Sequence, residues 1–392
     1  MIRRLASALR NFLLSCLALV AMMLVIAYVV GADIHYGDNP LASKVGDEGP
    51  HVFYQGDNVV VSYIRGGKES GFSIESTTYP ADSSISAEVQ FPLDGSRFSV
   101  EIHPDVGMPP PSEYQTTAPI LVISDVESNF KAMRDFLIAQ DVITTELSWA
   151  FGSGHLVLTG DFVDRGFSTT QVLWLIYKLE QEAASVGGKV HYILGNHEVK
   201  NLQGNYLKAA YKYTYIAGIL GLHQHELFAD SALLGRWLAS KNAVEKINDT
   251  LFLHGGIAPQ IAAQNLSLSQ INNIVRAAYR TQYFNQPEEE TKPEDVLNST
   301  TLGVVWYRGL LAGKLVQTDV DQVLAAFDVR AMVVGHTPQH RVSSLYEGSV
   351  FAVNVKHPTD YRGTFPSRRS EGLYIHNRRF YRALDDGRRL LL

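Results

Sequence analysis

The stretch HLVLTGDFVDRG, residues 155–166, joins a short apolar run to a turn that carries Gly, Asp and Arg. A run of Val and Leu bounded by such residues predicts a strand buried on both faces. Four other stretches share this form, namely ILVISDVES (120–128), VHYILGNHE (190–198), TLFLHGGI (250–257) and AMVVGHTP (331–338). Because loops at the carboxyl ends of strands form the ligand crevice of open α/β folds, we expect these five ends to converge.

The segments between these strands predict a layered α/β domain. Residues 129–140 and 168–181 carry apolar side chains at helical spacing, so each of the first two strands leads into a helix. Roughly fifty residues between GNHE and HGG have a mostly helical pattern and a set of tyrosines, and they form either a cap over the site or ordinary packing. GSVFAVNV (348–355) and GLYIHNRRFYRAL (372–384) predict strands that complete a second sheet.

Ahead of this domain, residues 33–106 contain alternating and β-branched stretches separated by Gly, Asp, Pro and Ser. This pattern predicts a small antiparallel β module, which serves as a spacer or binds a substrate or partner. Residues 107–117 include three consecutive prolines and predict an extended linker. We therefore expect a domain boundary there, with a second domain spanning residues 118–392.

Residues 1–32 predict a membrane anchor or an export signal. Residues 12–30 are uncharged and about long enough to cross a bilayer as a helix. Arg3, Arg4 and Arg10 precede them, so the positive-inside rule places residues 33–392 across the membrane from the cytoplasm. We expect an uncleaved anchor; if the membrane is a bacterial inner membrane, the domains that follow the anchor lie in the periplasm. If the small-residue ending Val30-Gly31-Ala32 is a cleavage site, the protein is secreted to the periplasm.

Composition limits the partners and the metal ligands. The net charge of -6 argues against nucleic acid as a partner. The single cysteine, Cys16, lies in the apolar N-terminal run, so a disulfide within one chain and a cysteine-rich zinc site are both excluded. Carboxylates, imidazoles and amides must therefore hold any metal.

The motifs GDFVDRG, GNHE, HGGI and GHT together resemble those of the calcineurin-like metallophosphoesterases. Within that superfamily, GDxVDRG with GNHE is similar to the phosphoprotein phosphatases. WYRG (306–309), the extension GNHEVKNLQGN and the N-terminal apolar segment look most like the bacterial Shewanella-like phosphatases. The resemblance covers about residues 118–360, and it implies an α/β metallophosphoesterase fold of two packed β-sheets flanked by helices.

The resemblance also implies a site with two divalent metal ions. Asp161 would bridge them, Asp125 and Glu127 would complete the first position, and the second would be held by Asn196, His254 and His336. Mn2+ is the expected metal, with Mg2+, Fe or Zn2+ as alternatives.

The same resemblance implies the roles of four further residues. Arg165 and Arg308 would hold phosphate oxygens, because a guanidinium fork matches their geometry. His197 would protonate the leaving oxygen, with Asp164 orienting its ring. A metal-bridging hydroxide would attack the phosphorus in line, with no phosphoenzyme intermediate. Glu198, which completes GNHE, is expected to form a supporting hydrogen bond rather than to take part in the chemistry.

Glu127 departs from the family pattern, because most relatives have Asp-x-His where this chain has Asp125-Val126-Glu127. A glutamate is a harder and charged ligand, so we hypothesise a less electrophilic site, an alkaline shift of the activity optimum and a preference for Mn2+ or Mg2+. Alternatively, Glu127 marks a decayed first site in an inactive, phosphate-binding membrane protein.

These inferences predict a metal-dependent phosphatase that hydrolyses phosphomonoesters, with phosphoproteins as substrates. A small-metabolite or dinucleoside polyphosphate hydrolase is the enzymatic alternative, since similar motif sets occur in such enzymes.

Overall fold

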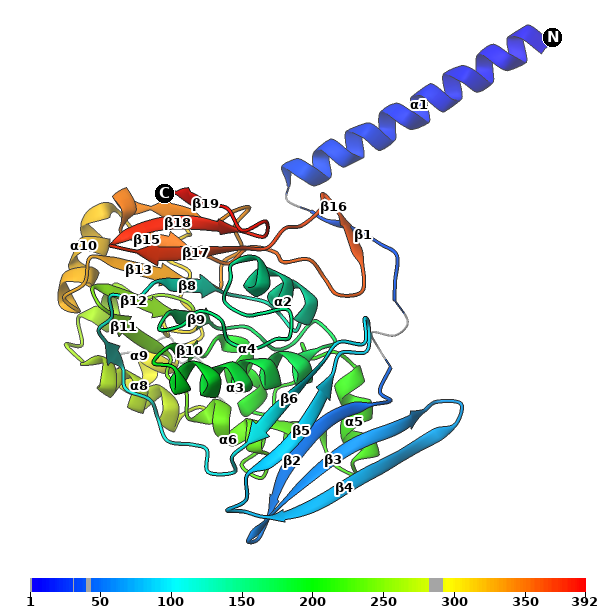
Figure 1. The fold of residues 1–392 in the computed structure, drawn as a ribbon. Helices are drawn as coiled ribbons and strands as arrows, with labels where there is room; N and C mark the ends of the chain where they lie inside the picture. Colours follow the sequence, from blue (N-terminus) through cyan, green and yellow to red (C-terminus); the bar gives the residue numbers. More distant parts are fainter. Residues whose placement is uncertain (1, 31, 40–43, 282–291) are drawn as a thin grey trace.

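Two six-stranded sheets packed face to face form the body of the protein, with helices on the outer faces (Figure 1). The structure is a computed structural model and describes residues 2–30, 32–39, 44–281 and 292–392. Gly31 of the predicted cleavage site lies outside the described residues. The prediction of two packed sheets flanked by helices is confirmed.

The first sheet contains three of the predicted motif strands, which run parallel to one another. Its order is β10-β9-β8-β17-β18-β19. The bounds are β8 Ile120–Ile123, β9 His155–Thr159, β10 Lys189–Ile193, β17 Glu371–His376, β18 Arg379–Leu384 and β19 Arg389–Leu391. We predicted that residues 372–384 belong to the second sheet, and this was wrong. They form β17 and β18, and β17 pairs antiparallel with β8.

The second sheet contains the other two motif strands, and its order is β14-β15-β13-β12-β11-β7. The bounds are β7 Glu113–Tyr114, β11 Val244–Ile247, β12 Thr250–Leu253, β13 Ala331–Val334, β14 Ser343–Leu345 and β15 Val350–Ala352. β15 fulfils the prediction for residues 348–355. β7 lies inside the predicted linker and pairs with β11, so the chain joins this sheet before it enters β8.

The apolar motif strands are buried on both faces because each lies between two layers. In β8, Ile120 and Val122 pack in the core between the sheets, whereas Leu121 and Ile123 pack against the helix layer. Burying each such side chain contributes roughly 1.5–3 kcal/mol. The predicted helices form in this layer as α2 (Phe130–Ala139) and α3 (Thr169–Ser185).

The remaining helices lie in the two long connections of the body. Between β10 and β11 are α4 Asn196–Leu202, α5 Lys212–Ile219, the 3-10 helix η1 Gln224–Phe228 and α6 Leu233–Ala239. Between β12 and β13 are α7 Pro259–Ala262, α8 Leu268–Ala277, α9 Pro293–Asn298 and α10 Gln317–Ala326. The short 3-10 helix η2 (Tyr346–Gly348) joins β14 to β15. The helical pattern predicted after GNHE is therefore confirmed.

The N-terminal strands form an antiparallel unit that packs on α3 (Figure 1). They are β2 Glu48–Gln55, β3 Asn58–Gly67, β4 Gly71–Pro80, β5 Ile85–Gln90 and β6 Arg97–Ile102. Trp174 Nε1 of α3 donates to Pro50 O at 2.8 Å, and Gln171 Nε2 donates to Gln90 O at 3.0 Å. Val61 and Val89 belong to the same core cluster as α3, so this unit shares a core with the body.

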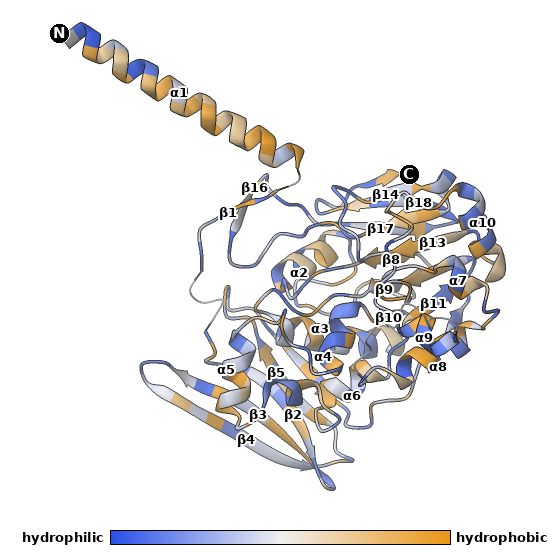
Figure 2. Cartoon of the chain, turned by 180° about the vertical axis from the view of Figure 1, so that it is seen from behind, coloured by the Kyte–Doolittle hydropathy of each residue, from blue (hydrophilic) through white to orange (hydrophobic). Residues whose placement is uncertain are grey.

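The N-terminal segment also contacts the body ahead of β2. β1 (Ile34–Tyr36) pairs antiparallel with β16 (Gly363–Phe365). Ahead of β1, helix α1 (Ile2–Val29) projects from the body and is largely apolar (Figure 2). It is long and apolar enough to cross a membrane, although a signal sequence would meet the same criterion.

A buried ion pair links the β strands to α5. Lys212 Nζ lies 2.8 Å from Glu48 Oε2, and both side chains are 1% exposed. The same ammonium donates to Phe167 O at 2.9 Å. Lys212 therefore connects β2, α5 and the loop that carries the GDFVDRG motif.

We expect Lys212→Met to lower the free energy of unfolding by about 3–5 kcal/mol, because it leaves the buried Glu48 carboxylate without a counterion. Urea unfolding of the full chain in mild detergent measures this loss. Arg97→Met is the matched control, since Arg97 and Glu88 form a pair in which both side chains are 55% exposed and which contributes roughly 0–1 kcal/mol. Equal losses in the two variants would contradict the prediction.

Candidate active site

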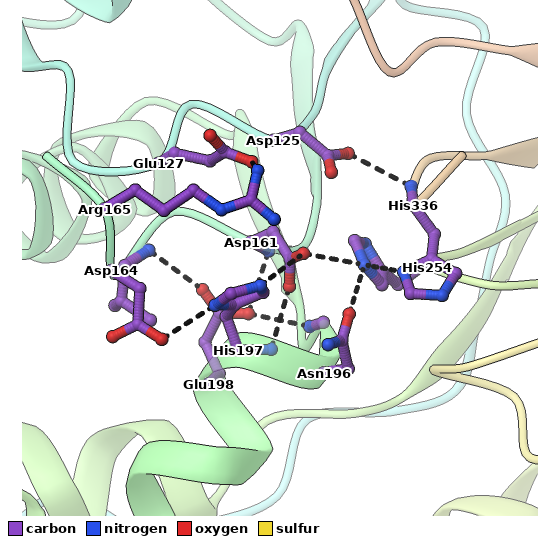
Figure 3. Close-up of polar contacts among 12 residues, drawn as sticks. Asp125, Glu127, Asp161, Asp164, Arg165, Asn196, His197, Glu198, His254 and His336 are labelled. Carbon is purple, nitrogen blue, oxygen red and sulfur yellow. Dashed lines mark hydrogen bonds and ion pairs between the residues drawn. The ribbon is translucent and has the colours of Figure 1, made fainter. Parts of the chain in front are cut away.

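The five motif strands bring their following residues to one place (Figure 3). β8, β9 and β10 end just before Asp125, Asp161 and Asn196, and β12 and β13 end just before His254 and His336. The two sheets supply opposite sides of the site. This is the convergence that the strand-end argument predicted, although it uses two sheets rather than one.

The loops that follow these strands turn sharply, so several of their non-glycine residues adopt left-handed backbone conformations. Each such residue costs roughly 1–2 kcal/mol relative to an ordinary conformation. The residues are Asp125 (φ 53°), Glu127 (φ 51°), Ser128 (φ 59°), Asp161 (φ 60°), Asp164 (φ 69°), Arg165 (φ 60°) and His336 (φ 62°). Backbone strain of this kind collects at functional sites, where the surrounding structure enforces it.

Two glycines of the motifs are needed because other groups approach them closely. A Cβ at Gly195 would lie 2.3 Å from Asp161 Oδ1, and a Cβ at Gly335 would lie 2.2 Å from Ser124 Oγ. These distances are far below van der Waals contact. The glycines of GNHE and GHT thus allow the loops to close around Asp161 and Asp125.

Four potential ligand atoms meet around the ring of His254. Its Nε2 lies 3.1 Å from each of Asp161 Oδ2, Asn196 Oδ1 and His336 Nδ1. His254 Nδ1 lies 2.7 Å from Thr159 O and so carries the proton when the ring is neutral, which leaves the Nε2 lone pair facing the other three atoms. With His254 neutral and His336 protonated on Nε2, four acceptor atoms face one another, which is unfavourable unless a cation lies among them.

The electrostatics of this cluster likewise favour positive charge. Burial disfavours a charged His254 ring, but the Asp161 carboxylate outweighs burial and raises the pKa of His254 to about 9. His336 Nε2 is buried and has no hydrogen-bond partner. Asp161, His254 and His336 form a group whose ligand atoms lie within 4.8 Å of one another. One carboxylate, one amide oxygen and two imidazoles suit a divalent metal ion.

Asp125 lies beside this cluster but is bound by protein donors. Its carboxylate accepts from Ser124 Oγ at 2.6 Å, from Asn354 Nδ2 at 2.7 Å and from His336 N at 3.1 Å. Burial raises the pKa of Asp125 to about 7. We did not predict Asn354 from the sequence. The available signal was its position just after the apolar strand in GSVFAVNV, which matches the pattern of the five motifs.

Glu127 lies away from the Asp161–His254–His336 group. Its carboxylate forms a short ion pair with Arg165 (Figure 3). Burial raises the pKa of Glu127, and the Arg165 guanidinium opposes this effect. The residue predicted as a metal ligand is therefore the direct partner of an arginine predicted to bind phosphate.

His197 and Asp164 form the predicted pair. His197 Nδ1 lies 2.7 Å from Asp164 Oδ2, and Asn201 Nδ2 donates to Asp164 Oδ1 at 2.8 Å. The other ring nitrogen, Nε2, lies 3.8 Å from Asp161 Oδ2. Burial alone would lower the pKa of His197, but the hydrogen bond to Asp164 and the charge of Asp161 raise it above its ordinary value. This arrangement favours a protonated ring directed at the centre of the site.

Glu198 holds two of the site loops together. Its buried carboxylate accepts from Asp161 N at 2.8 Å, Phe162 N at 2.7 Å and Gly195 N at 2.8 Å. These donors come from the loops after β9 and β10. The expectation that Glu198 forms a supporting hydrogen bond is confirmed.

Arg308 reaches the site from the connection between β12 and β13. Its Nη1 donates to His336 O at 3.0 Å and to Thr337 Oγ1 at 3.3 Å. Burial lowers the pKa of Arg308, and the charges of Asp125 and Asp161 oppose this effect. Arg308 and Arg165 thus bring two guanidinium groups to the region of Asp125 and Asp161.

Comparisons with known proteins agree with this geometry. The family model described as calcineurin-like phosphoesterase matches residues 118–340. The Shewanella-like protein phosphatase 1 of Plasmodium berghei is 25% identical over 251 residues, which are 60% of this chain and 66% of that protein. An uncharacterised protein of Schizosaccharomyces pombe is 27% identical over 259 residues, 62% of this chain and 74% of its own length.

A solved structure covers more of the chain. The cold-active protein-tyrosine phosphatase of a psychrophilic Shewanella species superposes with a TM-score of 0.74 and 28% identity, covering 88% of this chain and 99% of its own. That coverage exceeds the family match and therefore includes residues outside 118–340. From its motifs, its site and these matches, the chain belongs to the calcineurin-like phosphoesterase family and is a metal-dependent phosphatase.

Proposed function

We propose that this protein removes phosphate from phosphoproteins and uses two divalent metal ions, with Mn2+ preferred. The convergence of Asp161, Asn196, His254 and His336 on one point carries the proposal, because it creates a site for a cation beside a protonated histidine. The names of the relatives, a Shewanella-like protein phosphatase and a protein-tyrosine phosphatase, support a phosphoprotein substrate.

The protein's own residues divide the work of phosphate ester hydrolysis. When bound, the metal ions would neutralise phosphate charge and make a water acidic enough to attack. Asp161 would bridge the ions, Asp125 and Glu127 would hold the first, and Asn196, His254 and His336 would hold the second. Arg165 and Arg308 orient the phosphate oxygens. His197, held by Asp164, donates its Nε2 proton to the leaving oxygen.

We further propose that α1 remains uncleaved and spans a bacterial inner membrane, with the catalytic domain (118–392) in the periplasm. The three arginines near its start and its uninterrupted apolar length support this orientation. The β module (33–106) and the segment 107–117 would then lie on the same side of the membrane as the site.

We expect the full chain in detergent with Mn2+ to hydrolyse phosphopeptides faster than diadenosine polyphosphates, and to hydrolyse p-nitrophenyl phosphate as well. Asp161→Asn should abolish turnover and lower the bound metal, measured by elemental analysis, because Asp161 is proposed to bridge both positions. Preferential cleavage of the dinucleotide would instead identify a small-molecule hydrolase. If the metal-loaded wild type turned over none of these substrates, the remaining alternative would be an inactive, phosphate-binding membrane protein.

The role of His197 predicts a dependence on the leaving group. His197→Gln should lower kcat about 10²- to 10⁴-fold on a phosphoserine peptide, whose alkoxide needs a proton. The loss should be much smaller on p-nitrophenyl phosphate, because nitrophenolate leaves without one. Asp164→Asn should produce the same contrast in weaker form. Equal losses on the two substrates would show that His197 binds phosphate rather than acting as an acid.

Glu127 has two competing partners, and metal analysis distinguishes them. If Glu127 ligates the first metal, Glu127→Ala should lower the bound Mn2+ from two to one per chain, and Glu127→His should restore two. The His variant should also move the activity optimum to lower pH, because a neutral ligand leaves the metals more electrophilic. If the wild type, Glu127→Ala and Glu127→His each bound two ions, Glu127 would be the ion-pair partner of Arg165 and not a metal ligand.

A further inference from the structure

A hollow of about 130 Å³ lies beside the catalytic centre. Asp125, Glu127 and Arg165 line it from the loops after β8 and β9, and residues 354–357, 359 and 361 together with Arg368 line it from the C-terminal segment. Within this second group, Lys356 and Arg368 are cations to which the phosphatase chemistry assigns no role. They add positive charge to a wall that Arg165 also lines, where the charge of Arg165 is paired with that of Glu127.

Lys356 and Arg368 share one carboxylate. Asp33 Oδ2 lies 2.6 Å from Arg368 Nη2 and 2.9 Å from Lys356 Nζ. Two cations and one carboxylate leave a formal charge of +1 at this end of the hollow. Arg368 Nε is also buried and has no hydrogen-bond partner. The guanidinium of Arg368 therefore has a donor that Asp33 does not use.

Asp33 reaches this place from a distant part of the chain. It lies between α1 and β1, more than 320 residues before its partners. The pairing of Ile34 with Phe365 fixes the neighbouring backbone, so Asp33 is held at the hollow by the ribbon of β1 and β16. Its side chain is only 14% exposed. The carboxylate thus occupies a site that is built by the catalytic body.

We propose that Lys356 and Arg368 form a second anion subsite, which binds an acidic side chain flanking the phosphorylated residue of a substrate peptide. Asp33 occupies this subsite when no substrate is present and competes with the acidic side chain. The inference rests on the proposed phosphoprotein function. Neighbouring residues of an extended peptide are about 3.5 Å apart, so a residue close to the phosphorylated one can reach along the same hollow.

The test compares phosphopeptides that differ only in one flanking residue. Peptides with Glu or its neutral isostere Gln, placed one or two positions on either side of the phosphorylated residue, are assayed with the metal-loaded full chain. The wild type should prefer Glu at one of these positions by roughly fivefold in kcat/KM, as expected for a partly exposed ion pair. Asp33→Asn should increase this ratio, because it removes the competing carboxylate.

Lys356→Met and Arg368→Met should each reduce the Glu-to-Gln ratio toward one. Arg369→Met is the matched control, since Arg369 is adjacent in sequence, is 66% exposed, pairs with Asp385 and lies outside the lining of the hollow. Its ratio should equal that of the wild type. Lys356 is 44% exposed, so its substitution tests the subsite even if Arg368→Met fails to fold.

A wild-type ratio of one, or an unchanged ratio in both Lys356→Met and Arg368→Met, would overturn the subsite. If Arg369→Met reduced the Glu-to-Gln ratio as much as the other two variants do, the preference would come from general surface charge. This outcome would also overturn the subsite. These outcomes differ from a failure of the proposed function. In that case the wild type would cleave neither the phosphopeptides nor p-nitrophenyl phosphate.

Discussion

The active site depends on buried carboxylates that bind backbone N–H groups rather than metals or substrate. Glu198 accepts from the loops after β9 and β10 at once, and it thereby holds Asp161 next to Asn196 and His197. Asp360 acts similarly at the other side, accepting from Phe130 N and Lys131 N at the start of α2 and from Ser168 Oγ. These bonds offset the cost of the left-handed residues between the strands and the helices, so the candidate metal ligands are held in place before any metal or substrate binds.

The sequence predicted the elements of the fold well, because each is encoded locally. Short apolar runs ending on polar residues gave β8, β9, β10, β12 and β13, and helical spacing gave α2 and α3. The residues of a strand do not by themselves determine which sheet the strand joins. Residues 372–384 have the alternation of a strand pair, but only long-range pairing with Leu121 and Val122 places β17 in the first sheet.

The same limit applies to the candidate site. The motifs identified the residues that meet around His254, since each follows its own strand. They did not identify Asn354, which follows an apolar strand but lies outside the family motifs, and which the pairing of β15 with β13 brings to Asp125. Nor did they show that Glu127 contacts Arg165. Side-chain partners depend on rotamers and neighbouring loops, which residue spacing does not specify.

The ribbon of β1 and β16 limits how far the catalytic body can move from α1. Only residues 30–33 lie between the end of α1 and the start of β1, a tether that reaches about 17 Å when fully extended. For a protein anchored by α1, encounters with phosphorylated partners in the same membrane would depend on their density per area of bilayer. A freely diffusing phosphatase would meet its substrates according to their concentration in the surrounding volume.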